Sequence, residues 1–472
     1  MKKIIICAAN ITQLDSFYDS NFLNNIKNTY DLSFLIGNLD KNDNKIINRI
    51  KNFGQILEIA DNFSKKNKIN FRQKLNLFCY FGNEILKNIG RFKNDFLIER
   101  TLAVNAPHLL NFFKFLYNFK LLNILFSIAI FFLKIKPINV FGKKNIKEFD
   151  LILIAYKIYD PSSFTDELIR FSRRNNVKTY GIQINWDALV FRIPLEKPDF
   201  LAVWGEQSFS FSVGLHEISP YRVFPTGPLA FDIYKNNQIK KETARQKLGL
   251  PINGKIIAVC LSDIVYDDIF LVEKINKLLI NKAFSADTFF YFKGYRYGKD
   301  LTLKKSFMME YGRQYKNIKT HKNIYFWEPK LLNLEKRDYF RNFFKAVDGI
   351  ISTFSTMSVE ASLHNLPSIA LHYDPSKYKV NTYGFPFKLY SYHLYSLKNQ
   401  DGLIYCNSRN ELKNSIEKLL NFNKTILKKG HLTKIPLSSV YYAEETASEK
   451  LKKSIDVILT KGKRDNSYIG YK

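Results

Sequence analysis

Small hydroxyl residues follow a short apolar run in residues 348–361, which read DGIISTFSTMSVEA. We expect DGIIS to form a buried strand and MSVEASLHN to form a helix. The hydroxyl residues Ser352, Thr353, Ser355 and Thr356 lie where the strand gives way to the helix, and such residues cap helices at their amino ends. The free amides of a first helical turn, together with the positive end of the helix dipole, favour an anion there. The segment therefore predicts a site for a phosphate-bearing ligand.

One carboxylate lies a helical turn further on. Glu360 follows Thr356 by four residues, so both side chains lie on the same side of the expected helix. From that position Glu360 can accept hydrogen bonds from the hydroxyls of a ribose. An ordinary capped helix would carry the same residues, and that alternative stays open. Ligands of open α/β sheets bind outside the carboxyl ends of the strands, and this segment is one such end.

The surrounding elements alternate between strands and helices. The expected strands are residues 3–9, 31–37, 149–155, 178–184, 200–204, 255–261, 289–293, 348–352, 367–371 and 403–405. Residues 51–100 are amphipathic and read as helical, and so does the segment 163–175. This alternation predicts an α/β protein with parallel sheets flanked by helices.

The chain has 472 residues, which favours two domains of about 200 residues each. A polar, turn-rich stretch separates the two series of strands near residues 232–253. We therefore expect an N-terminal Rossmann-like domain over residues 1–235 and a second one over 236–440. Residues 441–472 are expected to form a C-terminal helix and a basic tail.

The most apolar segment, LLNILFSIAIFFL, covers residues 121–133 within the stretch 112–136. It is too short to span a bilayer, which requires roughly 20 residues. Two interpretations remain open. The segment is either a buried helix or a helix lying in the membrane interface, with the flanking lysines at the headgroups. Those lysines are Lys114, Lys120, Lys134 and Lys136.

Lys and Arg number 72 against 43 Asp and Glu, which gives a net charge of +29. Such a field attracts nucleic acid, an anionic membrane surface or phosphate-bearing substrates. Solvated surface lysines that reflect only coding bias would give the same net charge. No zinc-finger or RNP-like motif favours a nucleic-acid partner.

The four cysteines are far apart and form no C-x-x-C, which favours free, mostly buried thiols in a reducing compartment. The start, MKKIIICAAN, reads as a first strand rather than a signal peptide, because its apolar run is very short. These features favour a cytoplasmic protein.

Three stretches carry a resemblance to a known group. Residues 184–232 contain W-D, P-D, V-W-G-E-Q, H-E-I, T-G-P and F-D in order; the others are RQKLGLPINGKIIAVCLSD and ISTFSTMSVEASLHNLPSIAL. Together they resemble the GT-B-fold transferases related to CDP-glycerol glycerophosphotransferases and bacterial surface-polysaccharide glycosyltransferases, over residues 151–371. The resemblance implies two Rossmann-like domains of GT-B type facing across a cleft. The first would hold an acceptor and the second a nucleotide-linked donor.

The resemblance also implies roles for single residues. Ser262 and Asp263, after the first strand of the second domain, would face the donor. Lys293 and Arg296, after the next strand, would offer positive charge, although the His-Pro pair of many relatives is absent there. The resemblance marks His216 as structural.

Transfer from such a donor needs an activated acceptor hydroxyl. The candidates for the general base are Asp15, after the first strand, and Asp187, beside Trp186. Asp160 reads as a turn residue before Pro161. The chain has no D-x-D triplet and no His pair at metal spacing, so we expect no metal and no cofactor, and stabilisation of the leaving group by helix dipole and cations. It also has no G-x-G, so the dinucleotide fingerprint of oxidoreductases is missing.

The expected function is a metal-independent glycosyltransferase at the inner face of the cytoplasmic membrane. Its partners would be a nucleotide-sugar donor and a glycan or lipid-linked acceptor. Three alternatives stay open: a CDP-glycerol-type polyol-phosphate transferase, a sugar-nucleotide epimerase of similar fold, and a non-catalytic basic protein binding anionic membrane or nucleic acid.

Overall fold

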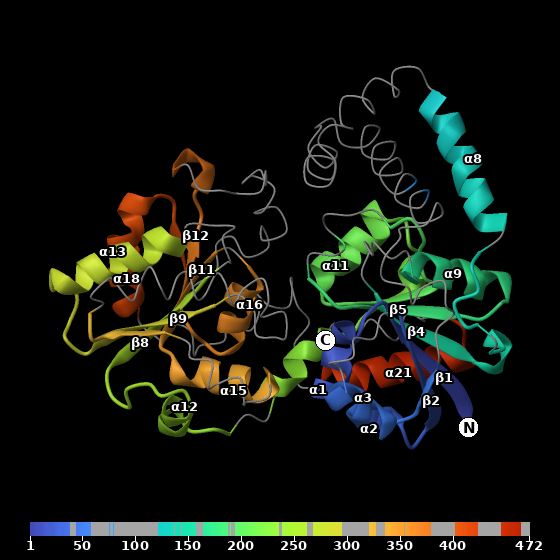
Figure 1. Ribbon diagram of the computed structural model, residues 1–472, viewed down its shortest axis with the longest axis horizontal. Coiled ribbons are helices and arrows are strands. Elements are labelled where there is room, and N and C mark those ends of the chain that lie inside the picture. The colour runs from blue at the N-terminus through green and yellow to red at the C-terminus, as the bar shows by residue number, and fades with distance from the viewer. Residues whose placement is uncertain are drawn as a thin grey trace. The chain divides into compact units, whose positions relative to one another are not determined.

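Two parallel sheets form the framework of the computed structural model, one in each of two units (Figure 1). Unit 1 comprises Met1–Lys235 and Leu437–Lys472, and unit 2 comprises Asn236–Pro436. The structure describes residues 1–37, 44–57, 75, 79, 121–135, 137–142, 144–156, 164–186, 189, 194–235, 238–261, 268–294, 321–326, 336–353, 355–378, 402–422 and 445–463.

The sheet of unit 1 has seven strands in the order β3-β2-β1-β4-β5-β6-β7, and every pairing is parallel. These strands are β1 (Lys2–Ala8), β2 (Tyr30–Ile36), β3 (Gln55–Leu57), β4 (Leu151–Tyr156), β5 (Thr179–Gln183), β6 (Phe200–Val203) and β7 (Val223–Pro225). β4 is buried along its whole length, as expected for a continuous apolar run at the centre of a parallel sheet.

Helices cover both faces of this sheet because alternate strand residues point to opposite sides. Ile5 and Cys7 of β1 belong to the core cluster that includes α9 (Phe164–Arg174), while Ile4 and Ile6 belong to the cluster on the other face. Figure 1 shows α9 and α11 (Glu206–Ser210) on the first face. The second face carries α1 (Asp15–Asp19), α2 (Phe22–Ile26), α3 (Asn44–Lys51) and α21 (Ala447–Thr460).

The C-terminal helix α21 belongs to unit 1, although most of that unit comes from the other end of the chain. Leu451, Ile455 and Ile458 are fully buried in the core cluster beneath the sheet. The Tyr180 hydroxyl of β5 lies 2.6 Å from the Ser454 hydroxyl of α21. The expected C-terminal helix is therefore present, and it packs as part of unit 1.

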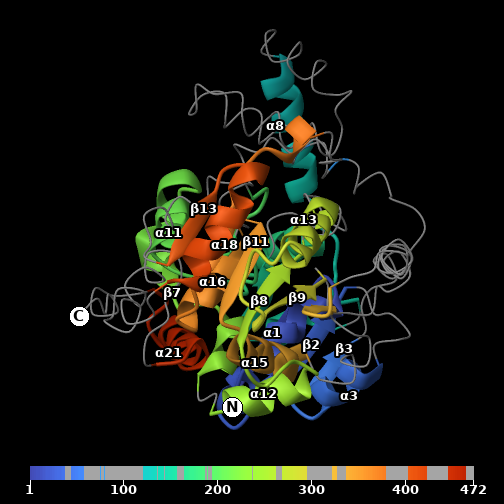
Figure 2. The same cartoon turned by 90° about the vertical axis from the view of Figure 1, so that its left-hand side faces the viewer.

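The sheet of unit 2 has six parallel strands in the order β10-β9-β8-β11-β12-β13. They are β8 (Lys255–Cys260), β9 (Thr288–Lys293), β10 (Ile324–Phe326), β11 (Gly349–Thr353), β12 (Ser368–Leu371) and β13 (Leu403–Cys406). One face packs on α13 (Asp268–Ile280) and α18 (Leu412–Leu420). The other face carries α12 (Lys241–Lys247), α15 (Lys336–Ala346) and α16 (Thr356–Leu363), as Figure 2 shows.

The predicted fold class is confirmed, because both units are parallel sheets flanked by helices in the Rossmann strand order. All ten expected strands are present within two residues of their predicted bounds. The three strands that the sequence missed, β3, β7 and β10, have three residues each and lie at sheet edges. The helical expectation for residues 51–100 is wrong at Gln55–Leu57, which is β3; most of the remainder lies outside the described residues.

All four cysteines are buried and free, as the sequence predicted. Cys7, Cys260 and Cys406 lie on strands, where a thiol packs as a small apolar side chain. Burial raises the pKa of the Cys7 thiol well above its ordinary value, which keeps it protonated and unreactive.

Candidate functional site

The strand order of unit 2 reverses between β8 and β11. From that pair the chain runs outward in both directions, through β9 and β10 on one side and through β12 and β13 on the other. Ser352, near the end of β11, is the register partner of Cys260, the last residue of β8. Ligands of doubly wound sheets bind at the carboxyl ends of the strands at such a switch point. The hydroxyl segment predicted from the sequence begins at this place in the fold.

The hydroxyl residues divide between the strand and the helix that follows it. Thr353 ends β11 and is 8% exposed, whereas Ser352 before it is 1% exposed. Ser355 is the N-cap of α16: it is extended, and its Oγ accepts a hydrogen bond from the Met357 N–H at 3.3 Å. Thr356 is the first residue of the helix. The serine cap therefore fixes where the positive end of α16 begins, next to the switch point.

Ser352 holds a buried hydroxyl that finds no hydrogen-bond partner among the residues that the structure describes. Burying an unpaired hydroxyl costs on the order of 1–3 kcal/mol. Such a group at the carboxyl end of a central strand is suited to a ligand that supplies the missing hydrogen bond. This is an observation, independent of the helix terminus, that points to a polar ligand at this edge of the sheet.

Lys293 lies at the same edge but deeper than the sequence suggested. It is the last residue of β9 and the register partner of Cys260. The side chain is 5% exposed, and its Nζ donates to the Gly294 carbonyl at 3.1 Å and lies 5.2 Å from the centre of the Phe340 ring. Burial lowers the pKa of Lys293.

Glu360 lies on α16 and is half-buried. Its carboxylate acts electrostatically on Lys293 and on Cys260, and in both cases the effect is to raise the pKa of the neighbour. Strand register places Lys293, Cys260 and Ser352 side by side, and Glu360 influences the first two electrostatically. Ser262, Asp263 and Arg296 lie outside the described residues.

In unit 1 the strand order reverses between β1 and β4. Asp15 follows β1 through the short turn η1 (Ile11–Leu14) and is the first residue of α1, so it lies at this second switch point. Its carboxylate accepts a hydrogen bond from the Tyr18 hydroxyl at 2.7 Å. The chain after β2 passes close to the chain after β1, because a Cβ on Gly37 would meet the Ala9 carbonyl oxygen at 2.8 Å.

The other acceptor-side candidates fall in different places. Asp187 lies outside the described residues, as does Asp160. His216 is buried at 1% exposure, and its Nε2 lies 2.6 Å from the Leu189 carbonyl oxygen. That contact joins Leu189 to the segment after α11.

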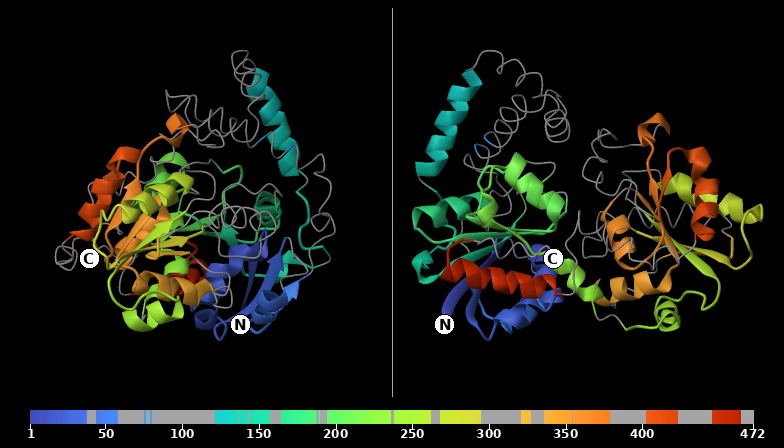
Figure 3. Two further views of the ribbon diagram at one scale, coloured as in Figure 1. Left: turned by 60° about the vertical axis from the view of Figure 1, so that its left-hand side comes forward. Right: turned by 180° about the vertical axis from the view of Figure 1, so that it is seen from behind.

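The apolar segment of the sequence forms α8 (Leu121–Ile135), which extends beyond α9 and α11 in unit 1 (Figures 1 and 3). Among the described side chains of this helix, Ala129 and Leu133 are buried in a small cluster with Cys79 and Leu195. Five large apolar side chains on it are exposed, namely Ile124 (58%), Leu125 (43%), Ile128 (48%), Phe131 (62%) and Phe132 (61%). At 100° per residue they cover an arc of roughly 120°. Among the described helices, none has the length and apolarity needed to cross a bilayer.

Sequence reasoning missed a buried ionic cluster near the end of α8. The Arg170 guanidinium bonds to Glu167 and Glu196, each at 2.8 Å, and all three side chains are at most 4% exposed. Glu167 also accepts from the Ile138 N–H at 2.9 Å, three residues beyond the end of α8. The cluster thus ties the chain after α8 to α9. The i,i+3 spacing of Glu167 and Arg170 is visible in the sequence, but it is also what a solvated helix face shows.

No model of a protein family matches this chain, and no curated protein matches it. Solved structures do. The chain is similar to a Listeria monocytogenes protein assigned as a UDP-N-acetylglucosamine 2-epimerase, at 12% identity over 98% of each chain, with a TM-score of 0.52. A glycosyltransferase from Rickettsia africae has a TM-score of 0.51 and 11% identity over 100% of this chain and 99% of its own. An Anabaena protein in complex with UDP has a TM-score of 0.50 and 9% identity over 97% and 99%. At these identities the similarity establishes the fold, that of the GT-B enzymes.

Proposed function

We propose that this protein is a glycosyltransferase that moves a sugar from a nucleotide-linked donor, held by unit 2, to a surface-glycan acceptor at a membrane. The observation that carries the proposal is the switch point of unit 2. A serine-capped helix terminus, a buried ammonium and a buried hydroxyl that has no hydrogen-bond partner among the described residues lie there. The similar Anabaena protein was solved with UDP, which supports a nucleoside diphosphate as the ligand.

In the proposed reaction the acceptor oxygen forms a bond to the anomeric carbon while the bond from that carbon to the diphosphate oxygen breaks. The bonding electrons leave with the nucleoside diphosphate. Charge that develops on it is stabilised by the amino end of α16 and by the hydroxyls of Thr353, Ser355 and Thr356, without a metal or another cofactor. Ser262, Asp263 and Arg296 are assigned to the same donor.

The proton of the acceptor hydroxyl passes to a carboxylate of unit 1. Asp15 and Asp187 are the two candidates. The strand order favours Asp15, because Asp15 lies at the switch point of unit 1, where doubly wound sheets bind ligands. The Tyr18 hydroxyl bonded to Asp15 would orient the carboxylate.

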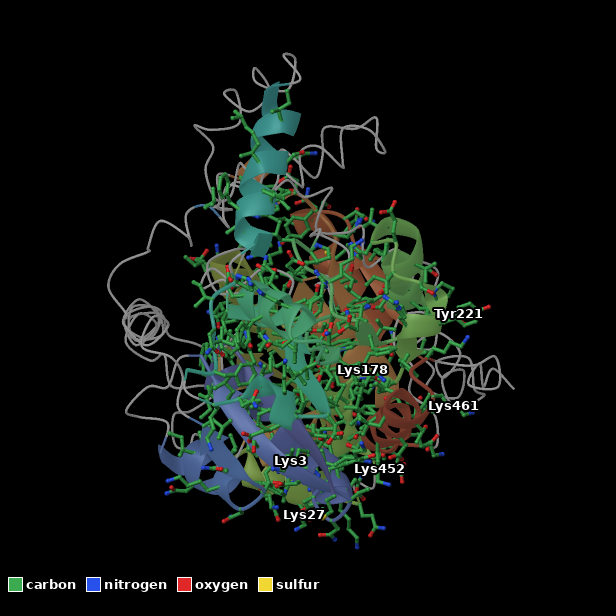
Figure 4. All side chains as sticks on the ribbon, turned by 90° about the vertical axis from the view of Figure 1, so that its right-hand side faces the viewer. Lys3, Lys27, Lys178, Tyr221, Lys452 and Lys461 are labelled. Carbon is green, nitrogen blue, oxygen red and sulfur yellow. The ribbon has the colours of Figure 1, made fainter. Side chains whose placement is uncertain are left out.

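The exposed face of α8 supports a membrane-bound acceptor. Five neighbouring apolar side chains are costly to leave in water, at about 25 cal/mol per Å² of apolar surface. An interfacial helix buries such a face among lipid acyl chains. The net charge of +29 favours an anionic bilayer over a neutral one. Figure 4 shows exposed lysines elsewhere on unit 1 as well, below α8 in that view, such as Lys3, Lys27, Lys178 and Lys461.

The exposed apolar face of α8 also favours transfer over epimerisation, the activity assigned to the similar Listeria protein. An epimerase converts a soluble nucleotide sugar and needs no acceptor and no lipid-facing helix. We place the reaction at the inner face of the cytoplasmic membrane, where nucleotide-linked donors are available. A CDP-linked polyol-phosphate donor would use the same helix terminus, with a nucleoside monophosphate as the leaving group.

The test is a thermal-shift screen with UDP, GDP, CDP and CMP, followed by turnover of the matching nucleotide sugars with anionic membrane extract as acceptor. We expect one nucleoside diphosphate to raise the melting temperature and its sugar to pass to a lipid-extractable product. Conversion of the donor sugar without any acceptor would instead show an epimerase. Binding of no nucleotide, together with steeply salt-dependent binding to nucleic acid or vesicles, would favour the non-catalytic basic protein.

A further inference from the structure

The chain that leaves α8 is held on α9 at two points. The Glu167 carboxylate of α9 accepts a hydrogen bond from the Ile138 N–H at 2.9 Å, three residues beyond the end of α8. Phe141, which is 1% exposed, stacks on Phe171 of α9 with the ring centres 6.1 Å apart. Because the connection is so short in sequence, the carboxyl end of α8 is fixed to α9.

Buried charges fix α9 in turn. The Arg170 guanidinium donates to Glu167 and to Glu196 at 2.8 Å each, and all three side chains are at most 4% exposed. The Glu196 N–H donates to the Asp166 carboxylate of α9 at 3.3 Å. Charges buried in this way hold one geometry, because a buried charge that loses its partner is strongly destabilising. We call Glu167, Arg170 and Glu196 the charged joint, since they join α9 to the segment before β6.

The segment before β6 reaches both α8 and the end of β4. Leu195 packs on the small cluster under α8 and also on the main core of unit 1. The next residue, Glu196, accepts through its carbonyl oxygen a hydrogen bond from the Tyr156 hydroxyl at 3.1 Å. Tyr156 is the last residue of β4, one of the two strands at the switch point of unit 1. Contacts therefore run from α8 to the edge of the sheet where the acceptor is proposed to bind.

The sheet leaves room for this segment at Gly181 of β5. A Cβ on Gly181 would meet Cγ of Pro198 at 2.9 Å and Cγ of Tyr156 at 3.1 Å. The segment therefore packs directly against β4 and β5, and a shift of Glu196 acts on the strands themselves.

We propose that the charged joint transmits bilayer binding at α8 to the acceptor edge of unit 1, which makes the transferase membrane-stimulated. This inference rests on the function proposed above. A bilayer that buries the apolar face of α8 restrains that helix, and the joint passes the restraint to α9, to Glu196 and to the end of β4. An acceptor that binds to an edge already ordered loses less conformational entropy, so its affinity rises without a change of fold. By linkage, the acceptor strengthens vesicle binding by the same factor.

The test is amide hydrogen exchange of the full chain, with and without vesicles of phosphatidylglycerol and phosphatidylcholine in equal parts. In wild type, we expect the vesicles to slow exchange in α8 and also in α9, in residues 194–199 and at the end of β4. The expected slowing outside α8 is about fivefold or more, which is the lower end of typical coupling between two sites.

The triple variant Glu167→Gln/Arg170→Met/Glu196→Gln removes all three charges at similar volume, so no member of the joint stays charged and unpaired. It should float with the vesicles as wild type does, because none of the three residues lies on α8. It should nevertheless lose most of the slowing in residues 194–199 and in β4. Arg173→Met is the matched control. Arg173 bonds to Glu196 at 2.8 Å from an exposed position, so its removal should leave the slowing intact.

Two results would overturn the inference. If vesicles slow exchange in wild-type α8 alone, the restraint does not pass beyond that helix. If the triple variant keeps the slowing in residues 194–199, the charged joint does not carry it. Should the triple variant fail to fold, Glu167→Gln decides the question, because the amide keeps the size of the side chain and loses the charge that pairs with Arg170; unchanged slowing in that variant refutes the joint. Wild type that does not float with the vesicles would instead contradict the membrane-bound acceptor of the proposed function.

Discussion

Asp232 accepts a hydrogen bond from the backbone N–H of Ser448 at 2.9 Å, although the two residues lie 216 positions apart in the sequence. The other carboxylate oxygen of Asp232 accepts from the Ala447 N–H at 2.8 Å. Asp232 thus caps the amino end of α21 from a different part of the chain, in addition to the capping box between Thr446 and Glu449. The F-D pair of the sequence therefore closes unit 1 around its last helix.

Asp232→Ala should loosen α21, because two amides in its first turn lose their acceptor. Loss of a helix cap costs roughly 0.5–2 kcal/mol, and the buried setting favours the upper end. Urea unfolding followed by proteolysis at the C-terminal helix measures the effect. Asp31→Ala, at an exposed position on β2, is the matched control and should change neither the free energy of unfolding nor the rate of proteolysis. Equal stability of the two variants would contradict the capping role.

Asp348 is the first residue of the hydroxyl-bearing segment, yet its contacts are structural. Its carboxylate bonds to Arg245, which is 3% exposed, at 2.7 Å, and accepts from the Ile256 N–H at 2.9 Å. Asp348→Ala should destabilise unit 2 by about 3–5 kcal/mol, because it removes one partner of a largely buried ion pair. Nucleotide affinity of the folded fraction should stay unchanged. Ser355→Ala is the comparison variant. It should lose little stability but bind the nucleoside diphosphate clearly more weakly, and calorimetry measures both.

His364 makes the stability of unit 2 depend on acid. Burial, and to a smaller extent Lys345, lowers the pKa of His364 to about 3, and its ring stacks on Phe344 with centres 4.7 Å apart. Because the folded pKa lies below the unfolded value of 6.5, the folded state binds fewer protons between these values. Stability is therefore complete above pH 6.5 and falls as the pH drops toward 3, by at most ~1.4 kcal/mol per pH unit.

His364→Phe should remove this component while keeping the ring stacking. The melting temperature of the variant should fall less steeply than that of wild type between pH 6.5 and 4.5, and the two slopes should agree between pH 7 and 8. Scanning calorimetry at matched ionic strength makes the comparison. Parallel curves throughout would show that the pKa of His364 is the same in the folded and the unfolded state, so that its burial does not make stability depend on acid.

The exposed face of α8 should decide membrane binding. The triple variant Ile124→Gln/Ile128→Gln/Phe132→Gln should reduce flotation with anionic vesicles at least tenfold, because each large apolar side chain contributes about 1.5–3 kcal/mol when buried. Its melting temperature should match wild type, since these side chains are exposed. Ile269→Gln, exposed at 46% on α13, is the control and should float normally. A lowered melting temperature without loss of flotation would favour the buried-helix alternative.

The general base should appear in the kinetics. If Asp15 takes the acceptor proton, Asp15→Asn lowers turnover by about 10²–10⁴-fold and leaves donor affinity unchanged. Tyr18→Phe should give a smaller loss, because it removes only the hydrogen bond that orients the carboxylate. Asp187→Asn is measured in parallel. Loss of less than about tenfold in both aspartate variants would exclude them as the base.

The sequence by itself determined the elements of the two units. Apolar runs such as FDLILIA and KIIAVCL are long enough to be recognised, because a central parallel strand is buried on both faces. The edge strands β3, β7 and β10 have only three residues each, which leaves too short a pattern to detect. Small hydroxyls before a helical segment likewise identified the end of β11, because capping is a local interaction between neighbours in sequence.

Tertiary structure decided which of these residues meet. Register across three strands sets Lys293 beside Cys260 and Ser352, on the face of the sheet where Tyr291 meets α15. Strand order, which no local pattern encodes, placed the hydroxyl segment and Asp15 at the two switch points. It was also the fold that assigned α21 to unit 1 through Asp232. The physical reason is the same in each case: capping and periodicity act within a few residues, whereas register, charge pairing and burial join residues that the chain alone keeps far apart.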